Sequence, residues 1–316
     1  MRGSVAHWGG VASRSARNLL SPTGIRGTAI EVAWLAAHIA SYPFGVAQER
    51  PAEEMDRYTL DGLPPVHRGL LIGDVEAAGT PILLIHGLVD NRSIFTVLRR
   101  ALRRRGFGRI WSMNYHVLTH DLRAASRRFE ATVEAICEQT GYERIHVVGH
   151  SMGGVVARYY VQRMGGDARI HTLVTLGSPH GGTHAAKLLP TGVCRQLQPS
   201  SEVLAELREP APGCRTRFVA FWSDLDALIS PKRAACIEHP DLNARNVLVR
   251  GVGHLSLPIH GRVTREIAAT LAHLDTHGTT LSAGVTRLQP PSADPETSAP
   301  GRARGRNRSG RRASAG

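Results

Sequence analysis

One stretch of the sequence, residues 144–157, constrains the fold of this chain more than any other. Residues 145–148 form a largely β-branched, apolar run that is typical of a buried strand. A pentapeptide with the spacing G-x-S-x-G follows at 149–153. Beyond it, apolar residues recur at helical spacing as far as Met164. We therefore expect a strand, a tight turn and a helix, with Ser151 at the turn.

A serine at such a turn has its hydroxyl held clear of the sheet, as a nucleophile requires. The glycines two residues before and after it remove side chains that would collide there. The N–H of Met152 would begin the helix and face an oxyanion, assisted by the positive end of the helix dipole. The alternative is an ordinary N-cap serine, but the flanking strand and helix favour a nucleophile.

Two later strands are each followed by residues that could complete a catalytic triad. A serine needs a base, and the base needs a group that orients it. In open α/β sheets such groups gather at the carboxyl ends of strands. The strand ending at Trp222 is followed by Asp224 and Asp226, and the strand ending at Val249 is followed by His254. This chain order is the order that α/β-hydrolases use.

Strands alternate with helices along the middle of the chain. This alternation predicts the α/β class, with a mostly parallel central sheet and helices on both faces. Expected strands are 81–87, 109–113, 145–148, 170–176, 217–222 and 247–249, with a possible edge strand at 69–72. Expected helices are 92–105, 121–139, 155–164 and 261–275.

The chain resembles the α/β-hydrolase superfamily and, within it, the bacterial triacylglycerol lipase/esterase group, from about residue 80 to 275. The resemblance implies the α/β-hydrolase fold, a small cap or lid insertion at about 184–213, and ester hydrolysis. The motifs that carry it are His86-Gly87, Gly149-His150-Ser151-Met152-Gly153-Gly154, Gly177-Ser178-Pro179-His180-Gly181-Gly182-Thr183, Asp226 with Pro231, and Gly253-His254.

The resemblance implies roles for the triad residues. Ser151 would be the nucleophile, and His254 the base toward it and then the acid toward the leaving alcohol. Asp226 fits the family's spacing before an isoleucine and a proline better than Asp224 does. Asp224 would instead bond to its own loop or be solvated, and His150 would be structural.

The resemblance also implies an oxyanion hole made of two backbone N–H groups, those of Leu88 and Met152. The substrate pocket would be bordered by His86, Gly87, Pro179 and His180. Leucines and valines within 184–210 offer apolar surface, which would suit an acyl chain or simply pack the cap on the core. We expect no metal and no organic cofactor.

The sequence divides into five regions. Residues 1–24 are expected to be a flexible basic arm, and 25–47 an apolar or amphipathic helix. That helix would pack on the main domain or dock on a membrane surface. Residues 48–68 are a connector, 69–277 the hydrolase domain, and 278–316 a disordered Arg/Pro-rich tail.

Composition limits the classes of partner. The net charge of +13 is typical of a protein with an anionic partner, but six of the arginines lie within 301–316. Aromatic residues make up only 5% of the chain. We do not expect nucleic acid binding, because no stacking platform is visible. The expected partners are an acyl-ester or lipid substrate and, through residues 25–47, a membrane surface. A cytoplasmic or peripheral-membrane location is favoured; secretion and oligomeric state are left open.

The four cysteines show no metal-binding spacing. Cys194 and Cys214 flank one loop region and could pair, although two reduced cysteines are favoured.

The sequence thus predicts a serine carboxylic-ester hydrolase, a lipase or esterase that works through a Ser-Asp-His triad and an acyl-enzyme. The alternatives are an acyltransferase or thioesterase on the same fold, or a non-catalytic basic binding protein that has kept a hydrolase scaffold.

Overall fold

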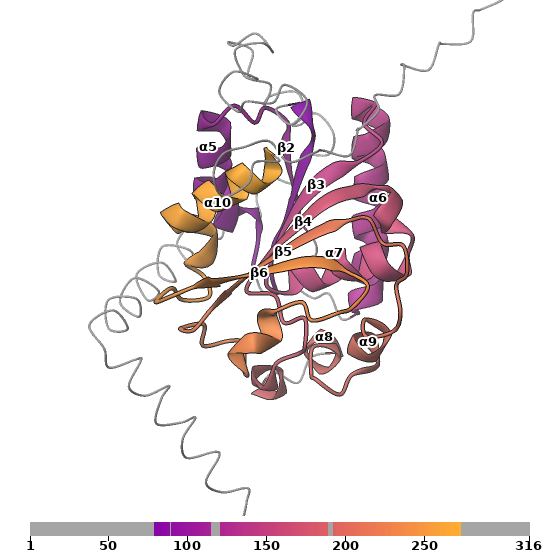
Figure 1. Ribbon diagram of the computed structural model, residues 1–316, viewed down its shortest axis with the longest axis vertical. Helices are drawn as coiled ribbons and strands as arrows, with labels where there is room; N and C mark the ends of the chain where they lie inside the picture. The colour runs from indigo at the N-terminus through magenta and orange to yellow at the C-terminus, as the bar shows by residue number, and fades with distance from the viewer. Residues whose placement is uncertain (1–78, 89, 115–120, 189–191, 273–316) are drawn as a thin grey trace, which may run out of the picture.

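The computed structural model describes residues 79–88, 90–114, 121–188 and 192–272 (Figure 1). The expected arm, the helix at 25–47, the connector, the edge strand at 69–72 and the tail lie outside these residues. The described chain forms a six-stranded, wholly parallel sheet in the order β2-β1-β3-β4-β5-β6. The strands are β1 (Ile82–Ile85), β2 (Ile110–Met113), β3 (Ile145–His150), β4 (Ile170–Leu176), β5 (Arg217–Ser223) and β6 (Asn243–Val249).

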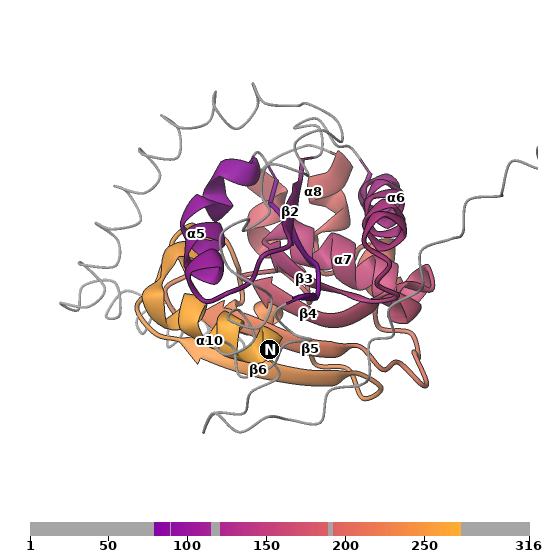
Figure 2. The ribbon, with the colours of Figure 1, turned by 90° about the horizontal axis from the view of Figure 1, so that it is seen from above.

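Helices cover both faces of the sheet (Figure 2). Helices α5 (Thr96–Arg104) and α10 (Gly261–Leu271) pack on one face, called here the α5/α10 face. Helices α6 (Leu122–Thr140) and α7 (Met152–Arg163) pack on the other, the α6/α7 face. This arrangement confirms the expected fold class.

Side-chain alternation along the strands builds the two halves of the core. In β1, Ile82 and Leu84 join the apolar cluster under α5 and α10, whereas Leu83 and Ile85 join the cluster under α6 and α7. Successive strand residues point to opposite faces. Because both faces are covered, all four residues are fully buried, which explains why β1 is a continuous apolar run.

The caps of the helices follow from local sequence. The Asp121 carboxylate accepts the N–H of Arg123 at 2.8 Å and so caps the start of α6. The same helix ends at Gly141, which has the left-handed φ of 72° that a glycine tolerates without strain. Asn91 caps the 3-10 helix η2 (Arg92–Phe95), which leads directly into α5.

The expected cap insertion consists of short elements on the α6/α7 face: η4 (His184–Leu188), α8 (Gly192–Gln196) and α9 (Glu202–Glu206). Its apolar side chains lie in the core cluster with α6 and α7, at 0–6% exposure. They therefore pack the cap on the domain. These residues are Val193, Leu197, Val203, Leu204 and Leu207.

Polar contacts also tie the cap down. The Glu206 carboxylate accepts the hydroxyl of Tyr159 at 2.6 Å and pairs with Arg123. The buried guanidinium of Arg158 donates to the carbonyl of Leu207 at 3.0 Å. The cap is thus joined to both helices of its face.

Some expected boundaries were wrong. The last strand was expected at 247–249 and begins at Asn243; its first residues are polar and half-exposed because β6 is an edge strand, so they carry no apolar signal. The apolar spacing covers 155–164, and the helix runs from Met152, whose N–H was expected to begin it, to Arg163; the two glycines in its first turn carry no apolar signal. The helix expected at 92–105 starts instead as a 3-10 turn.

The strand order reverses between β1 and β3, which are neighbours in the sheet. The chain leaves β1 toward α5 on one face and leaves β3 toward α7 on the other. In open α/β sheets, ligands bind in the crevice that opens at such a point beyond the carboxyl ends of the strands. Leu88 and Ser151 follow these two strands.

Candidate active site

Ser151 lies at the turn between β3 and α7 in a strained conformation. Its φ of 53° and ψ of −126° make it the only non-glycine residue with a positive φ within the described residues. Its N–H donates to the carbonyl of Leu176 at the end of β4, at 2.9 Å. Strain of this kind costs about 1–3 kcal/mol and persists only where the surroundings enforce it.

The turn of residues 149–153 around Ser151 is called here the elbow. Close backbone contacts require its glycines. A Cβ on Gly149 would lie 2.6 Å from the Cα of Gly154. A Cβ on Gly153 would lie 2.5 Å from the carbonyl oxygens of Ile85 and His86. The start of α7 is therefore pressed against the end of β1, which holds Ser151 beside the loop that follows β1.

That loop contains the first expected oxyanion donor. A Cβ on Gly87 would lie 2.8 Å from the Cβ of Ser151 and 3.4 Å from its Oγ, so Gly87 passes directly beside the Ser151 side chain. The Nδ1–H of the buried His86 donates to the carbonyl of Gly87 at 2.8 Å, which stiffens the loop. Leu88 comes next and is half-buried.

The second expected donor is Met152, the first residue of α7. The first N–H groups of a helix have no intrahelical acceptor, and the helix dipole makes this end positive. A carbonyl oxygen placed between the loop after β1 and the start of α7 would therefore meet donors from both sides.

The Asp226 and His254 side chains form a buried pair. His254 Nδ1 lies 2.7 Å from Asp226 Oδ2, and the two residues are 3% and 1% exposed, respectively. Asp226 Oδ1 accepts the N–H groups of Leu228 at 2.9 Å and Ile229 at 3.1 Å. Burial would raise the pKa of Asp226, but His254 and these two N–H groups lower it below its usual value. Asp226 is thus an ionised acceptor.

This pairing fixes the tautomer of His254. The ionised carboxylate accepts the Nδ1 proton, so Nε2 is the unprotonated ring nitrogen, as a base requires. Asp224, two residues before Asp226, makes a different contact: its Oδ1 accepts the N–H of Gly251 at 2.8 Å. Asp224 therefore stabilises the loop that carries His254, residues 250–256, instead of the His254 ring. We call this loop the histidine loop.

Two contacts place the His254 pair beside the elbow. The Nε2–H of His150 donates to the carbonyl of His254 at 3.1 Å, and the two rings lie 4.8 Å apart. A Cβ on Gly177 would lie 2.9 Å from Asp226 Oδ2 and 3.0 Å from His254 Nδ1. The Asp226–His254 pair thus lies at the edge of the sheet where Ser151 follows β3.

His150 has a structural role in this arrangement. It is 1% exposed, and its Nδ1 lies 3.4 Å from Oδ2 of the buried Asp90. Since its other nitrogen donates to the backbone of the histidine loop, His150 links the elbow to that loop and to the start of η2. Asp90 was not singled out from the sequence, where it is one aspartate in a polar loop.

Thr183 holds the loop that carries Asp226. Its hydroxyl donates to the carbonyl of Leu228 at 2.8 Å and accepts the N–H of Ser230 at 2.9 Å. The His184 N–H adds a bond to the Ser230 carbonyl at 2.9 Å. The end of the segment after β4, which was expected to border the active site, is thus bonded to the loop that carries Asp226, called here the acid loop.

Lys232 and Ser223 also support this loop, and neither was expected from the sequence. The Lys232 ammonium donates to the backbone carbonyl of Asp226. Burial lowers the pKa of Lys232, an effect that the charges of Asp226 and Asp224 oppose. The Ser223 hydroxyl donates to the carbonyl of Val252 at 2.5 Å, which joins the acid loop to the histidine loop. The sequence signal that could have pointed to Lys232 is its position six residues after Asp226.

Pro179 and His180, expected as pocket wall, are both buried. His180 Nε2 lies 2.9 Å from the hydroxyl of Thr175 on β4. Burial and the charge of Arg158 hold the pKa of His180 well below its usual value, so its ring is neutral. His180 is therefore a buried, neutral side chain that contacts β4.

Other expected features can be compared with the described residues alone. Within them, no group of three or more His, Cys, Asp or Glu side chains is arranged to hold a metal ion. Cys194 lies in the apolar core, whereas the Cys214 thiol contacts Asp167 at 3.4 Å; both are free thiols. Across the same part of the chain, every helix is too short or too polar to cross a membrane.

Comparisons with known proteins agree with this architecture. Residues 81–219 match the family model of palmitoyl protein thioesterases. This match includes the elbow and ends before Asp226 and His254.

Two solved structures show the same fold. The mature form of a Bacillus licheniformis lipase is 16% identical, with a TM-score of 0.52 over 62% of this chain and 92% of that one. Aspergillus fumigatus lipase B is 12% identical, with a TM-score of 0.54 over 61% of this chain and 52% of that one. The expected α/β-hydrolase fold and the resemblance to lipases and esterases are therefore confirmed.

Proposed function

We propose that this chain, an α/β-hydrolase by its fold, hydrolyses carboxylic esters of acyl chains by a serine mechanism. The single observation that carries the proposal is the buried pair of Asp226 and His254, 2.7 Å apart, beside the strained elbow of Ser151. Backbone strain at a serine serves no packing purpose, and such strain clusters at active sites. An ionised acid that orients a histidine is what activation of a serine requires.

In the first half of the reaction, Ser151 Oγ attacks the ester carbonyl carbon while its proton passes to His254 Nε2. The carbonyl oxygen becomes an oxyanion, and the N–H groups of Leu88 and Met152 stabilise it. The tetrahedral intermediate then collapses. The bond to the alcohol oxygen breaks, His254 returns its proton to that oxygen, and an acyl-enzyme remains on Ser151.

In the second half, water takes the place of the alcohol. His254 Nε2 removes a proton from water, whose oxygen attacks the acyl carbonyl. Collapse of the second intermediate releases the carboxylic acid, and His254 returns the proton to Ser151 Oγ. Asp226 stays ionised throughout and stabilises the positive charge on His254. Its low pKa and its bonds to the loop backbone suit this role.

The test is hydrolysis of p-nitrophenyl esters from acetyl to palmitoyl by wild type and Ser151→Ala. We expect the variant to lose at least about 10⁴-fold in kcat/KM, because no other group can form the acyl-enzyme. The control is Ser201→Ala, which removes the N-cap side chain of α9. We expect this variant to retain its activity. Equal activity in wild type and Ser151→Ala would overturn the mechanism.

A second candidate is thioester hydrolysis, which the match to the palmitoyl protein thioesterase model favours. The same triad serves both reactions, because the two differ only in the leaving group. Parallel assays of a palmitoyl ester and a palmitoyl thioester of matched chain length decide between them. A kcat/KM that is higher for the thioester by more than the difference in chemical reactivity would make the thioesterase the main activity.

A further inference from the structure

Helix α5 carries an unusual concentration of one charge. Its nine residues, TVLRRALRR, contain four arginines and no acid. Arg99 and Arg103 are four residues apart, as are Arg100 and Arg104, so like charges face each other along the helix. Each such pair destabilises a helix by about 0.2–0.5 kcal/mol. Stability of α5 therefore does not explain the pattern.

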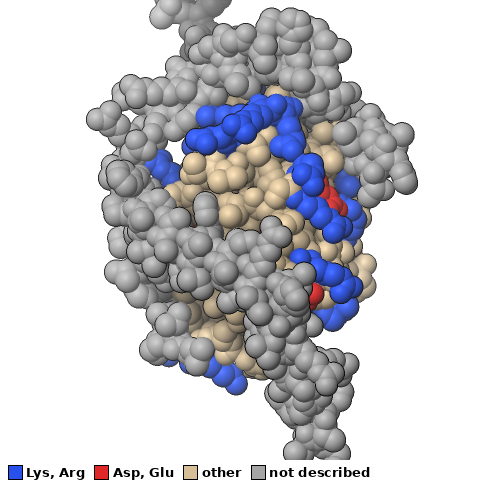
Figure 3. Space-filling model, turned by 90° about the vertical axis from the view of Figure 1, so that its left-hand side faces the viewer, with Lys and Arg blue, Asp and Glu red and all other residues tan. Residues whose placement is uncertain are grey.

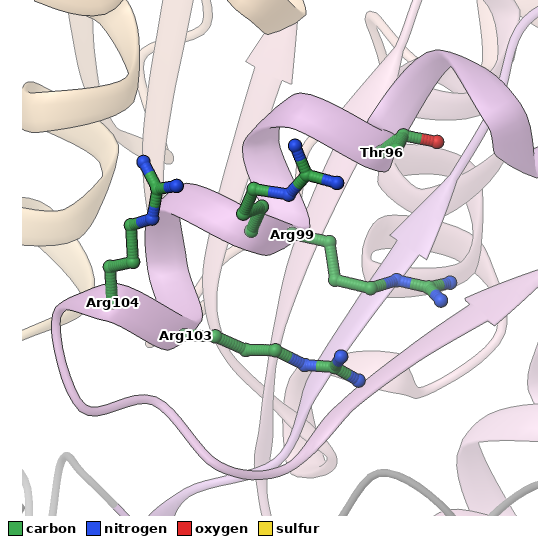
Figure 4. A pocket seen from close by; sticks show the side chains of 5 residues that line it. Thr96, Arg99, Arg103 and Arg104 are labelled. Carbon is green, nitrogen blue, oxygen red and sulfur yellow. The ribbon is translucent and has the colours of Figure 1, made fainter.

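The arginines line a hollow of about 400 Å³, together with Thr96 (Figure 4). The side chains of Arg99 and Arg103 extend in the same direction along it (Figure 4). Arg99 is steadied by a bond from its guanidinium to the hydroxyl of Ser112 on β2, at 2.5 Å. Guanidinium groups bind phosphate oxygens in pairs of parallel hydrogen bonds, so a hollow of this composition fits phosphate groups.

Helix α10 extends this basic surface. Helices α5 and α10 lie side by side (Figures 1 and 2), and Arg262 and Arg265 are exposed in the first turns of α10. Figure 3 views the molecule from the side on which these helices lie and shows several patches of basic side chains around an uncharged centre, with few acidic ones. We call Arg99, Arg100, Arg103, Arg104, Arg262 and Arg265 the arginine face.

On the opposite side of the sheet, exposed arginines such as Arg127 and Arg128 are accompanied by arginines that have acidic partners. Arg123 pairs with Glu206, Arg163 with Glu209 at 3.6 Å, and Arg169 with Glu134 at 2.8 Å. Arg100 and Arg104 are exposed, and within the described part of the chain neither makes an ion pair. Their charges are therefore available to an external anion.

The arginine face adjoins the edge of the sheet that carries the triad. Helix α5 follows η2 and the loop of Leu88, and η2 contacts η6 (Leu257–Ile259), which follows His254. With a rise of about 1.5 Å per residue, α5 places all its arginines within about 12 Å of its first residue, Thr96, along its axis. An anionic surface bound there would lie beside the active site.

We propose that the arginine face docks this protein on an anionic membrane surface, where its guanidinium groups bind lipid phosphates. Charge complementarity carries the proposal. Val97, 39% exposed on the same face of α5 as Arg100 and Arg104, adds apolar surface suited to a lipid interface. The choice of a membrane over other anions rests on the proposed function, since long acyl esters reside in membranes.

The test uses the full chain and vesicles of phosphatidylcholine, with or without phosphatidylglycerol, in a sedimentation assay. Each arginine near an anionic surface contributes roughly fivefold to partitioning. We therefore expect Arg100→Gln/Arg104→Gln to weaken binding to anionic vesicles about 25-fold and to leave the weak binding to neutral vesicles unchanged. Added salt should weaken wild-type binding in the same direction.

The control is Arg127→Gln/Arg128→Gln, which removes two exposed arginines from α6 on the opposite face. It changes the net charge by the same amount. Docking by the arginine face requires this control to bind anionic vesicles nearly as well as wild type. Equal weakening of both double variants would show that only total charge matters and would overturn the proposal.

Two parallel measurements separate the remaining outcomes. If the α5 double variant loses affinity for a DNA duplex but partitions into anionic vesicles like wild type, the surface binds nucleic acid and the proposal is wrong. Hydrolysis of p-nitrophenyl butyrate in solution should be equal in all three proteins. If the wild-type protein docks through this face but hydrolyses no ester, the proposed function is wrong. The proposed docking surface is then still supported.

Discussion

The turn that carries Ser151 and the loop that carries Asp226 meet at one edge of the sheet, but they are held in place differently. The turn is shaped by its own residues: glycines on both sides of Ser151 permit contacts that no Cβ would allow. The acid loop is shaped by distant residues, because Thr183 and Ser223 fix it to the segment after β4 and to the histidine loop.

The two halves of the site should therefore respond differently to substitution. Substitution within the elbow should act through steric conflict between backbones, which cannot relax by changing a rotamer. Substitution around the acid loop should act through lost hydrogen bonds, which water can replace in part. The following predictions test that division, in descending order of expected effect.

The largest effect is expected from Asp226→Asn. The amide can no longer hold His254 with its Nδ1 proton inward or stabilise the charged ring, so kcat/KM should fall by about 10³–10⁴-fold. Asp224→Asn is the matched control. Its amide oxygen can still accept the N–H of Gly251, and activity should stay close to wild type. Steady-state kinetics on p-nitrophenyl butyrate measures both. A larger loss in Asp224→Asn would exchange the roles of the two aspartates.

A smaller but still severe effect is expected from Gly153→Ala. Its Cβ would lie 2.5 Å from two backbone carbonyl oxygens, so the free energy of unfolding should fall by about 3 kcal/mol. At Gly165 a Cβ would meet nothing within 4 Å, and only its φ of 77° opposes alanine. Gly165→Ala should therefore cost about 1 kcal/mol. Urea unfolding gives both values, and equal losses would contradict the steric account of the elbow.

The smallest effect is expected from Thr183→Val, which removes a hydroxyl without changing the shape of the side chain. It leaves the Leu228 carbonyl and the Ser230 N–H without their partner, which should cost about 1–3 kcal/mol. The turnover number should fall too, since Asp226 is held by the same loop. Thr132→Val removes a hydroxyl that bonds only within α6 and should stay within about 0.5 kcal/mol. An unchanged turnover number in Thr183→Val would show that this contact does not contribute to catalysis.

Much of the site follows from neighbouring residues in the chain. The elbow was predictable because strand, turn and helix signals are consecutive there, and Asp226 and His254 were found because they follow the last two strands. The preference for Asp226 over Asp224 came from its spacing to Pro231 in the resembling family, and the structure places Asp226 against His254. Periodicity located most elements but missed the first residues of β6, since exposure at the edge of the sheet masks the apolar pattern there. The start of α7 at Met152 was expected from the turn motif, because the glycines of its first turn carry no apolar signal.

The contacts that surround the triad were not predictable. Thr183, Lys232 and Asp90 are ordinary polar residues in the sequence, and their roles depend on loops brought together from different strands. The same holds for arginines: the sequence does not distinguish Arg123, which is paired with the cap, from Arg100, which is exposed.

Sequence patterns were enough to predict the α/β class, the placing of Ser151, the aspartates and His254 after successive strands, and the turn at Ser151, because these depend on short-range patterns and local backbone sterics. The tertiary structure alone decided which aspartate meets His254, whether the cap leucines are buried, and which arginines have acidic partners. These outcomes depend on distances between segments far apart in the chain, and only the packing of helices on both faces of the sheet sets those distances.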